Sequence, residues 1–281
     1  MKPLSDLLDR CPLPEPEGDK DAKGTVVIVG GPPSCPGAVI LAATAALRVG
    51  SGRVQLVVDP TVTDVALVVP EAAVLGWDQH SAPHASVAEW AEQADVVIVG
   101  PGHTHVDDAT VKAICGRTSD AAVVLLDAGA LDAATSVASE RRLVIAPNPT
   151  EASKLLGRDA DDADEASLAD LLAKHIDGPV AVRGAVTVIA DGAESWLFDD
   201  SPTGLGTPGS GDVFMGVLGG VLAGGVEPLA ALAWAVALHA EAGRLLSAAT
   251  PVGYLASDLA RELPFARAAL TAAGAVSLPA R

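Results

Sequence analysis

The chain has 281 residues and a formal net charge of −18, with 49% hydrophobic and only 3% aromatic residues. This acidity argues against a nucleic-acid or anionic-membrane partner, because both are polyanions. The length suits one large α/β domain or two small ones, and the composition predicts a core of Ala, Val, Leu and Ile, as in parallel strands buried on both faces. The three cysteines, Cys11, Cys35 and Cys115, are odd in number and widely spaced, which indicates neither a disulfide framework nor a zinc site.

The first 22 residues are polar and rich in proline. We expect a leader that is loosely ordered or lies on the surface, and it lacks the apolar core of a signal peptide. The longest uncharged apolar stretch, at 213–226, is shorter than the roughly 18 residues that a membrane span needs. The chain is therefore expected to be cytoplasmic, with no membrane partner.

Short β-branched runs alternate with helical patterns along the rest of the chain. Strands are predicted at 25–29, 53–58, 71–75, 95–99, 123–126, 143–145, 180–182, 186–190 and 195–198, and helices at 37–49, 87–93, 107–114, 151–156, 167–175, 212–223, 229–248, 254–263 and 265–272. Asp191-Gly192 favours a hairpin between the last two strands. This alternation predicts a single domain over residues 1–281, with a mostly parallel central sheet and helices on both faces.

Turns that contain glycine, proline or polar residues follow four of the predicted strands, at 30–38, 100–104, 127–129 and 146–151. In open α/β sheets, ligands bind beyond the carboxyl ends of the strands. Glycines at those ends let backbone amides approach a ligand. Each turn alone is also consistent with ordinary turn chemistry, but four in one fold indicate a ligand site.

The strongest single motif is Thr207-Pro208-Gly209-Ser210-Gly211-Asp212, followed at once by an apolar helix. Two glycines and a helix N-terminus form an anion hole of N–H groups. Asp212 in the first helical turn suits a carboxylate that takes a proton from a hydroxyl attacking a phosphoryl group. The competing interpretation is an ordinary helix capped by Asp or Ser.

Other patterns carry less information. Gly204, Gly206 and Gly209 match a dinucleotide-binding pattern, but they lie outside a βαβ opening. His103 and His105 flank Thr104 in a credible binding loop, where we interpret them as polar lining rather than metal ligands. No metal site made by the protein alone is predicted.

Taken together in chain order, the motifs resemble one family, the ADP/ATP-dependent NAD(P)H-hydrate dehydratases of ribokinase-like fold. The resemblance covers residues 24–270 and implies a three-layer α/β/α architecture. The segments that carry it are Gly30-Gly31, Pro36-Gly37-Ala38, Val99-Gly100-Pro101-Gly102, Leu126-Asp127-Ala128, Pro147-Asn148-Pro149 with Glu151, Arg183-Gly184-Ala185-Val186-Thr187, Gly209-Ser210-Gly211-Asp212-Val213 and His239-Ala240-Glu241-Ala242-Gly243.

The resemblance implies a cofactor-repair reaction. Hydrated NADH or NADPH is phosphorylated on its ring hydroxyl by ADP, or by ATP, with Mg²⁺, and phosphate then leaves to restore the dihydropyridine. Bacterial members of the family typically use ADP, so an ADP-dependent dehydratase is expected. The resemblance assigns the hydroxyl-activating base and the contacts to substrate and nucleotide as follows: Asp212 as base; Ala38, Gly102, Asn148 and Asp212 on the hydrate; Arg183, Gly184, Ala185, Val186, Thr187, Gly209, Ser210 and Gly211 on the nucleotide, with the Gly209 to Gly211 amides on the transferred phosphate.

Three positions depart from the family pattern. Asn148 stands where the family usually has His, and an amide cannot titrate. Arg183 replaces the usual Lys, which keeps the charge but changes its geometry. Gly129 replaces a second acidic residue.

Two other functions stay open on the same fold. One is an ATP-dependent kinase of a small alcohol, such as a sugar or vitamin precursor, and the other is a nucleotide-binding protein that has lost catalysis. The Ala-rich helices at 229–248 and 254–272 are too apolar for full exposure, so we expect them to pack between subunits of a homo-oligomer. The family is similar in forming oligomers, a tetramer among them.

Overall fold

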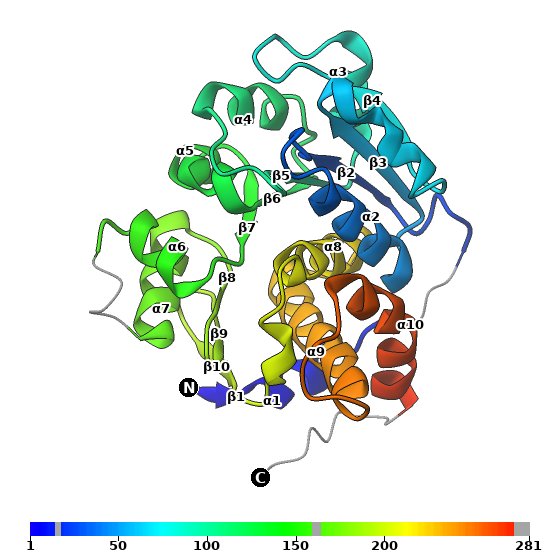
Figure 1. The fold of residues 1–281 in the computed structure, drawn as a ribbon. Helices are drawn as coiled ribbons and strands as arrows, with labels where there is room; N and C mark the ends of the chain where they lie inside the picture. The colour runs from blue at the N-terminus through cyan, green and yellow to red at the C-terminus, as the bar shows by residue number, and fades with distance from the viewer. Residues whose placement is uncertain (15–17, 159–163, 273–281) are drawn as a thin grey trace.

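The computed structural model describes residues 1–14, 18–158 and 164–272, which form three layers, helices on both faces of a central sheet (Figure 1). The described residues make a ten-stranded sheet in the order β1-β10-β9-β8-β7-β6-β5-β2-β3-β4. In chain order the strands are β1 (Lys2–Pro3), β2 (Thr25–Val29), β3 (Arg53–Val58), β4 (Ala73–Gly76), β5 (Val96–Val99), β6 (Val123–Leu126), β7 (Arg142–Ile145), β8 (Val180–Arg183), β9 (Thr187–Ala190) and β10 (Ser195–Phe198).

The sheet is mostly parallel, as the sequence predicted. β9 is antiparallel to both β8 and β10, whereas the other neighbouring pairs are parallel. The predicted hairpin joins β9 to β10, with Gly192 in the left-handed region at φ +88°. The carboxyl ends of β2, β3 and β5 to β8 therefore lie along one edge, where their turns can share a ligand.

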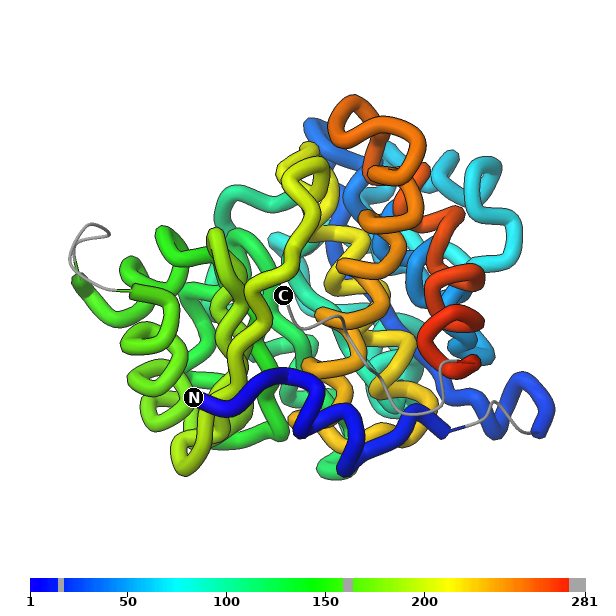
Figure 2. Tube along the Cα trace, turned by 90° about the horizontal axis from the view of Figure 1, so that it is seen from below, coloured from blue at the N-terminus to red at the C-terminus, as the bar shows by residue number. Residues whose placement is uncertain are grey.

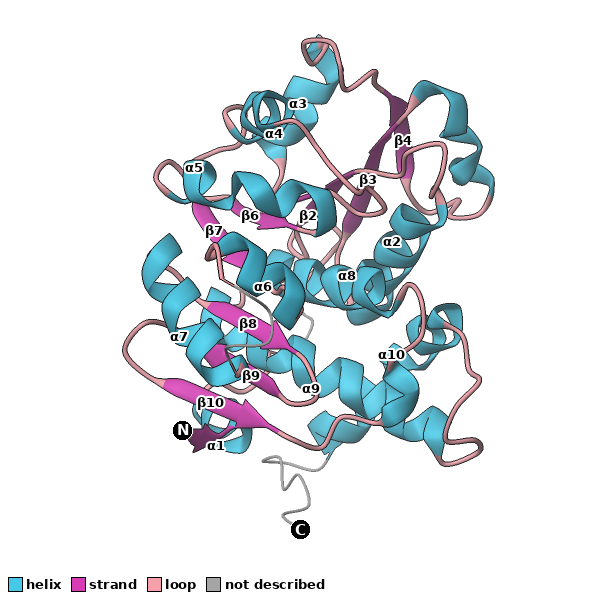
Figure 3. Cartoon of the chain, turned by 60° about the vertical axis from the view of Figure 1, so that its left-hand side comes forward, coloured by secondary structure: helices cyan, strands magenta, loops and turns pink. Residues whose placement is uncertain are grey.

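Two hydrophobic cores, one on each face, hold the layers together. Figure 3 shows α6 and α7 on one side of β8 to β10 and α9 on the other. One face carries α1 (Leu4–Arg10), α2 (Gly37–Val49), α8 (Ser210–Ala223), α9 (Pro228–Ser247) and α10 (Ala256–Ala272). The other carries α3 (Ala85–Gln93), α4 (Asp108–Cys115), α5 (Ala134–Ala138), α6 (Pro149–Leu155) and α7 (Glu165–Ile176). Short 3-10 helices lie at Pro60–Leu67, Ala128–Ala133 and Thr203–Leu205.

Small residues set the spacing between α2 and α8. A Cβ on Gly216 of α8 would stand 2.1 Å from the Ala42 carbonyl oxygen of α2, and one on Gly220 would stand 2.5 Å from Val49. Only glycine permits this approach, so the two helices pack almost backbone to backbone. Their N-termini consequently open side by side at the carboxyl edge of the sheet.

The prediction of a surface leader over residues 1–22 is corrected for residues 2–10. β1 pairs with β10, and Leu4, Leu7 and Leu8 of α1 are buried in the core. Their i, i+3, i+4 spacing makes one apolar helix face, which the polar average of the segment conceals. The indole Nε1 of Trp234 in α9 donates to the Cys11 carbonyl at 2.7 Å, and Figure 2 shows the N-terminal segment running from the β10 region past α9. Residues 15–17 lie outside the described residues.

The C-terminal helices differ from expectation in two ways. α9 is apolar and long enough to cross a membrane, but most of it is buried inside the protein. Its composition therefore reflects a core helix and gives no reason to place it between subunits. The predicted break at Pro264 is absent, since α10 continues through it. Burial of Leu263, Ala266 and Leu270 keeps the helix intact despite the missing N–H of proline.

Candidate active site

The turn before α8 forms a helix start that is open to an anion. Gly209 is the N-cap at φ +86°, and α8 begins at Ser210, with no side-chain cap hydrogen bond. A Cβ on Gly209 would stand 2.5 Å from Leu41, so this position also has no room for a side chain. The amides of Gly211 and Asp212 lie in the first turn, where the helix offers them no acceptor. The capped-helix interpretation was wrong, and the turn keeps these donors free for a ligand.

Ser210 is held by His239 of α9. His239 Nε2 lies 3.1 Å from both the Ser210 hydroxyl and the Ser210 carbonyl oxygen. Burial, with Arg183 as a second cause, lowers the pKa of His239 to about 3, so the ring is neutral. The edge of this ring packs against Phe214 at 5.6 Å between centroids. The pair fixes the start of α8 and adds no charge to the site.

Asp212 is the third residue of α8 and is partly buried. Within the described part of the chain its carboxylate has no hydrogen-bond partner. Burial raises its pKa to about 6, and the nearby Arg183 guanidinium opposes that rise. A carboxylate that is unpaired and ionised at neutral pH is well suited to accept a proton from a substrate hydroxyl.

Arg183 ends β8 and reaches toward the same helix. Ala181 of β8 packs in the core on the α8 face, so strand alternation places Arg183 on that face as well. Its Nε donates to the Ala146 carbonyl at 2.8 Å, and its guanidinium stacks over Phe214 at 4.3 Å. The guanidinium Nη2 is 3.7 Å from where a Cβ on Gly211 would stand. Arg183 thus places a fixed positive charge beside the open amides of α8.

Asp127 follows β6 and joins this group. Val124 and Leu126 face the α3–α7 core and Leu125 faces the α8 core. The backbone of Asp127 is still extended (φ −135°, ψ 153°), so its carboxyl points to the α8 side. Burial, then the Asp212 charge, raises its pKa to about 7, against the opposing effect of Arg183. Sequence reasoning noted this residue only as part of a motif, although the alternation of β6 could have shown where it points.

Ala38 and Gly102, predicted to contact the substrate, are brought together. Ala38 lies in the first turn of α2 and Gly102 follows β5. A Cβ on Gly102, which has φ +81°, would stand 2.9 Å from the Ala38 Cβ and 2.7 Å from the Cys35 carbonyl oxygen. The turns after β2 and β5 therefore close on each other without side chains, beside the start of α8.

Local contacts explain two of the departures from the family pattern, Asn148 and Gly129. Asn148 is the N-cap of α6. Its Oδ1 accepts a hydrogen bond from the Glu151 backbone amide at 2.9 Å, and the Glu151 side chain accepts one from the Asn148 backbone amide. The side-chain oxygen of Asn148 is thus engaged in a capping box, and its side-chain NH₂ remains as the donor for a ligand. A Cβ on Gly129 would stand 2.3 Å from the His105 amide nitrogen. The missing acidic residue therefore reflects a close backbone contact at this point.

A cavity of about 450 Å³ lies over β8, β9 and the start of α8. Five of the predicted nucleotide-site residues line it, together with Phe214 and His239: Arg183, Gly184, Ala185, Thr187 and Ser210. Val186, Gly209 and Gly211 do not. The amide of Ala185 is occupied, since it donates to Glu165 Oε1 at 3.0 Å. This cavity is large enough for a nucleotide whose phosphates point at α8.

A second cavity, of about 380 Å³, lies farther along the same edge, over the ends of β2, β3 and β4. Its lining includes Pro32, Asp59, Gln79 and His103. Pro32 also bounds the approach to Gly102, with its Cδ 3.2 Å from where a Cβ there would stand. The loop of His103 and His105 is polar lining in this cavity, and no group of three or more His, Cys, Asp or Glu suited to a metal is found in the described chain.

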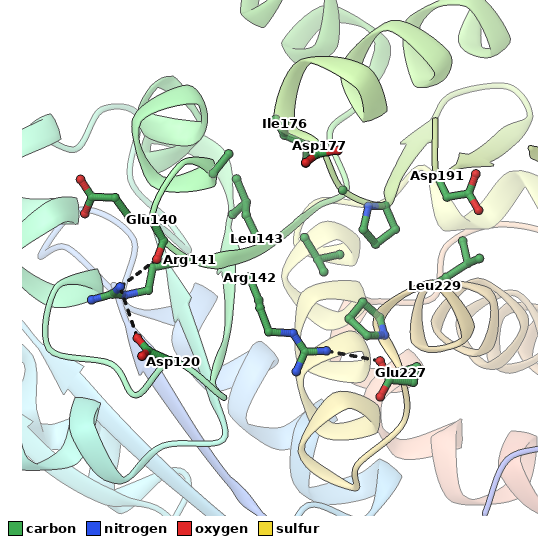
Figure 4. A pocket seen from close by; sticks show the side chains of 15 residues that line it. Asp120, Glu140, Arg141, Arg142, Leu143, Ile176, Asp177, Asp191, Glu227 and Leu229 are labelled. Atoms are coloured by element: carbon green, nitrogen blue, oxygen red, sulfur yellow. Dashed lines mark hydrogen bonds and ion pairs between the residues drawn. The ribbon is translucent and has the colours of Figure 1, made fainter. Parts of the chain in front are cut away.

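A larger cavity, of about 640 Å³, is elsewhere (Figure 4). It lies at the amino ends of β7 and β8, where Arg142 pairs with Glu227 at 3.3 Å. It contains none of the predicted site residues, and it lies at the opposite end of the strands from Asp212. The candidate active site is therefore identified by its converging charged groups and free backbone amides, and not by the volume of a cavity.

Comparison with known proteins agrees with this geometry. The sequence pattern of the NAD(P)H-hydrate dehydratase family matches residues 26–265. The chain belongs to this family. An ADP-dependent (S)-NAD(P)H-hydrate dehydratase of Xanthomonas campestris is 38% identical over 266 residues, covering 90% of this chain and 91% of that protein.

Further relatives of the NAD(P)H-hydrate dehydratase family show the same relationship. A bifunctional NAD(P)H-hydrate repair enzyme of Moorella thermoacetica is 34% identical over 83% of this chain, which spans about half (47%) of that protein. The structure is similar to that of the ADP/ATP-dependent dehydratase of Bacillus subtilis co-crystallised with ATP and Mg²⁺, with a TM-score of 0.80, 25% identity and coverage of 94% and 96% of the two chains. The ribokinase-like fold predicted from the sequence is confirmed, because a ribokinase-like superfamily protein of Enterococcus faecalis has a similar structure, with a TM-score of 0.81 and 23% identity over 94% of each chain.

Proposed function

We propose that the protein is an ADP-dependent (S)-NAD(P)H-hydrate dehydratase that returns hydrated NADH or NADPH to the active cofactor. The observation that carries this is the convergence of Asp212, Arg183 and Asp127 at the open start of α8, with Arg183 also lining the 450 Å³ cavity. The chemistry consumes one nucleotide: ADP and the hydrate yield AMP, phosphate and NAD(P)H. Family membership and the relatives named above support the substrate and the nucleotide.

The site supports the phosphoryl transfer as follows. The nucleotide lies in the 450 Å³ cavity, with its terminal phosphate at the Gly211 and Asp212 amides. Arg183 balances the charge on that phosphate. Asp212 takes the proton of the ring hydroxyl as its oxygen attacks phosphorus. Ala38 and Gly102 form the closely packed wall against which the hydrated ring is held.

Mg²⁺ fits this arrangement as a companion of the nucleotide. It prefers octahedral oxygen ligands and is commonly held by one or two carboxylates together with substrate phosphates. In the described chain no cluster of three acidic or metal-binding side chains offers a separate site. Bound with the nucleotide, the ion would neutralise part of the phosphate charge.

The second cavity supports a preference for the hydrate of NADH. The nucleotide fills the β8–β9 end of the edge, so the remainder of the dinucleotide extends toward β3 and β4. Carboxylates of Asp59 and Asp78 line that cavity, and no Lys or Arg is among its lining residues. The 2′-phosphate of NADPH adds nearly two negative charges, which such a lining disfavours. We expect kcat/KM to be higher for NADH hydrate than for NADPH hydrate. Asp59→Asn should reduce the difference between these two kcat/KM values.

The competing kinase function differs in its product. A kinase of a small alcohol would release a stable phosphate ester, whereas the dehydratase releases inorganic phosphate and a product absorbing at the NADH wavelength. Incubation with NADH hydrate, ADP or ATP and Mg²⁺ therefore decides between them. Nucleotide binding without turnover of any hydrate would identify the third possibility, a protein that has lost catalysis.

We propose a homo-oligomer in the cytoplasm that acts on its small-molecule substrate without nucleic acid. Since α9 is buried within one chain, a subunit contact has to use other surfaces, such as the exposed Phe265 of α10. Light scattering that gives the mass of a single chain would reject the oligomer.

A further inference from the structure

Dehydration of the hydrate requires the removal of two protons from different atoms. This inference rests on the proposed function. The hydroxyl proton leaves when its oxygen attacks the terminal phosphorus of ADP. The second proton leaves the neighbouring ring carbon, because restoring the double bond takes the oxygen from one carbon and hydrogen from the next. After the first step Asp212 is protonated, so the second step needs another acceptor or a prior return of that proton to solvent.

The structure provides a second carboxylate on the same side of the sheet. Asp127 follows β6, and the extended continuation of that strand directs its carboxyl toward the core face that α8 covers. Its backbone is closely held, since its amide donates to the Val99 carbonyl at 2.9 Å and its own carbonyl oxygen packs against Gly100. It therefore enters the site from the strand layer, whereas Asp212 enters from the helix layer.

We propose that Asp127 is the base of the elimination step. It takes the proton from the ring carbon next to the phosphorylated carbon. The electron pair of that C–H bond forms the carbon–carbon double bond, and the C–O bond to phosphate breaks. Phosphate departs with the bonding pair toward the Gly211 amide and Arg183, and Asp127 later releases its proton to solvent. No oxidant or further reactant is needed.

The electrostatics of the site suit this role. Burial is the main cause that raises the pKa of Asp127 to about 7, and the Asp212 charge is the second. Because burial remains after Asp212 has taken up a proton, Asp127 is still a stronger base than an ordinary carboxylate in the elimination step, and it is substantially ionised at neutral pH. Arg183 limits the rise and can receive the departing phosphate. A carboxylate with an unshifted pKa would be a weaker base for a carbon-bound proton.

A merely structural role for Asp127 makes a different prediction. Were it present only to hold Arg183, its loss would weaken the nucleotide site and slow phosphorylation and NADH formation together. As the elimination base, it can be lost while phosphorylation continues. The two readouts, AMP produced and NADH produced, therefore separate the roles.

The test is a single-turnover experiment on the Asp127→Asn variant with NADH hydrate, ADP and Mg²⁺. Quenched samples are analysed for AMP and for a hydrate heavier by one phosphoryl group, and absorbance follows NADH. We expect AMP formation within about tenfold of the wild-type rate and NADH formation slower by at least about 100-fold, with the phosphorylated hydrate accumulating. Loss of both activities by the same factor without that intermediate, or no change in either, overturns the proposal.

Control measurements separate a failure of the proposed function from a failure of the role assigned to Asp127. Asp132→Asn alters an exposed carboxylate of the same connecting segment, one that pairs with Lys154, and should leave both rates unchanged. ADP binding by calorimetry shows that Asp127→Asn is folded with an intact nucleotide site. A wild-type protein that consumes no nucleotide refutes the proposed function and this inference with it. An active wild type with both steps lost together in Asp127→Asn refutes only the assignment of Asp127.

Discussion

Replacing Asp212 by Asn should make the protein more stable at alkaline pH while removing its activity. The pKa of Asp212 is raised from 3.8 to about 6, first by burial. A carboxyl with a raised pKa contributes stability that is fully present below about pH 3.8 and is lost as the pH rises through about 6. At about pH 8 the ionised group therefore costs stability, because it is better solvated in the unfolded chain.

The size of the effect follows from the shift. About two pKa units, at about 1.4 kcal/mol each, give about 3 kcal/mol as an upper limit. Partial exposure of the side chain and the balancing charge of Arg183 reduce this, so we expect about 1–2 kcal/mol. Asn is nearly isosteric and carries no charge, so the variant should recover most of that cost at about pH 8 and none at about pH 4.

Urea unfolding of the wild type and of Asp212→Asn at both pH values measures the difference directly. Asp9→Asn, which alters an exposed residue of α1, controls for the loss of a surface charge. The free energy of unfolding of the variant should exceed that of the wild type at the higher pH only. A difference that is the same at both pH values, or a less stable variant at about pH 8, would show that Asp212 is not a strained buried base.

Other outcomes follow from the same geometry. The value of kcat/KM for the hydrate should fall as the pH drops through about 7 and 6, where Asp127 and Asp212 take up protons, and a profile flat to about pH 5 would contradict their roles. Arg183→Met keeps a stem over Phe214 but loses the charge, so the acidic limb of that profile should move to higher pH. Gly209→Ala combines positive φ with a clash and should lower the free energy of unfolding by about 1–3 kcal/mol in a denaturant titration. His239→Leu leaves buried polar atoms of Ser210 unpaired, at a cost of about 1–3 kcal/mol by the same measurement.

The sequence was sufficient for the sheet and its helices because their signals are local. The strands at 25–29, 53–58, 123–126 and 195–198 and the helix at 37–49 were predicted with the bounds they have. The segments it missed depend on long-range contacts. β1 forms only because β10 lies beside it. The apolar face of α1 is buried only because α9 packs against it. Pro264 marks a local break that tertiary burial overrides.

The site was predictable in its parts and not in its convergence. Turn chemistry identified the start of α8, and strand ends identified Gly102 and Asn148. The position of Asp127 beside Asp212 and Arg183 needed the register of two strands that are distant in sequence. The same applies to Gly129. A Cβ there would meet the backbone of His105, which lies 24 residues earlier in the chain and approaches Gly129 only after folding.

Incubation of the purified protein with NADH hydrate, ADP and Mg²⁺, with three products measured together, decides whether the protein is an ADP-dependent dehydratase. We expect NADH absorbance to return, with AMP and phosphate formed in amounts equal to the NADH, and Asp212→Asn to slow this reaction by at least about 100-fold. Wild-type protein that is folded and binds ADP, yet restores no NADH with ADP or ATP, would contradict this expectation.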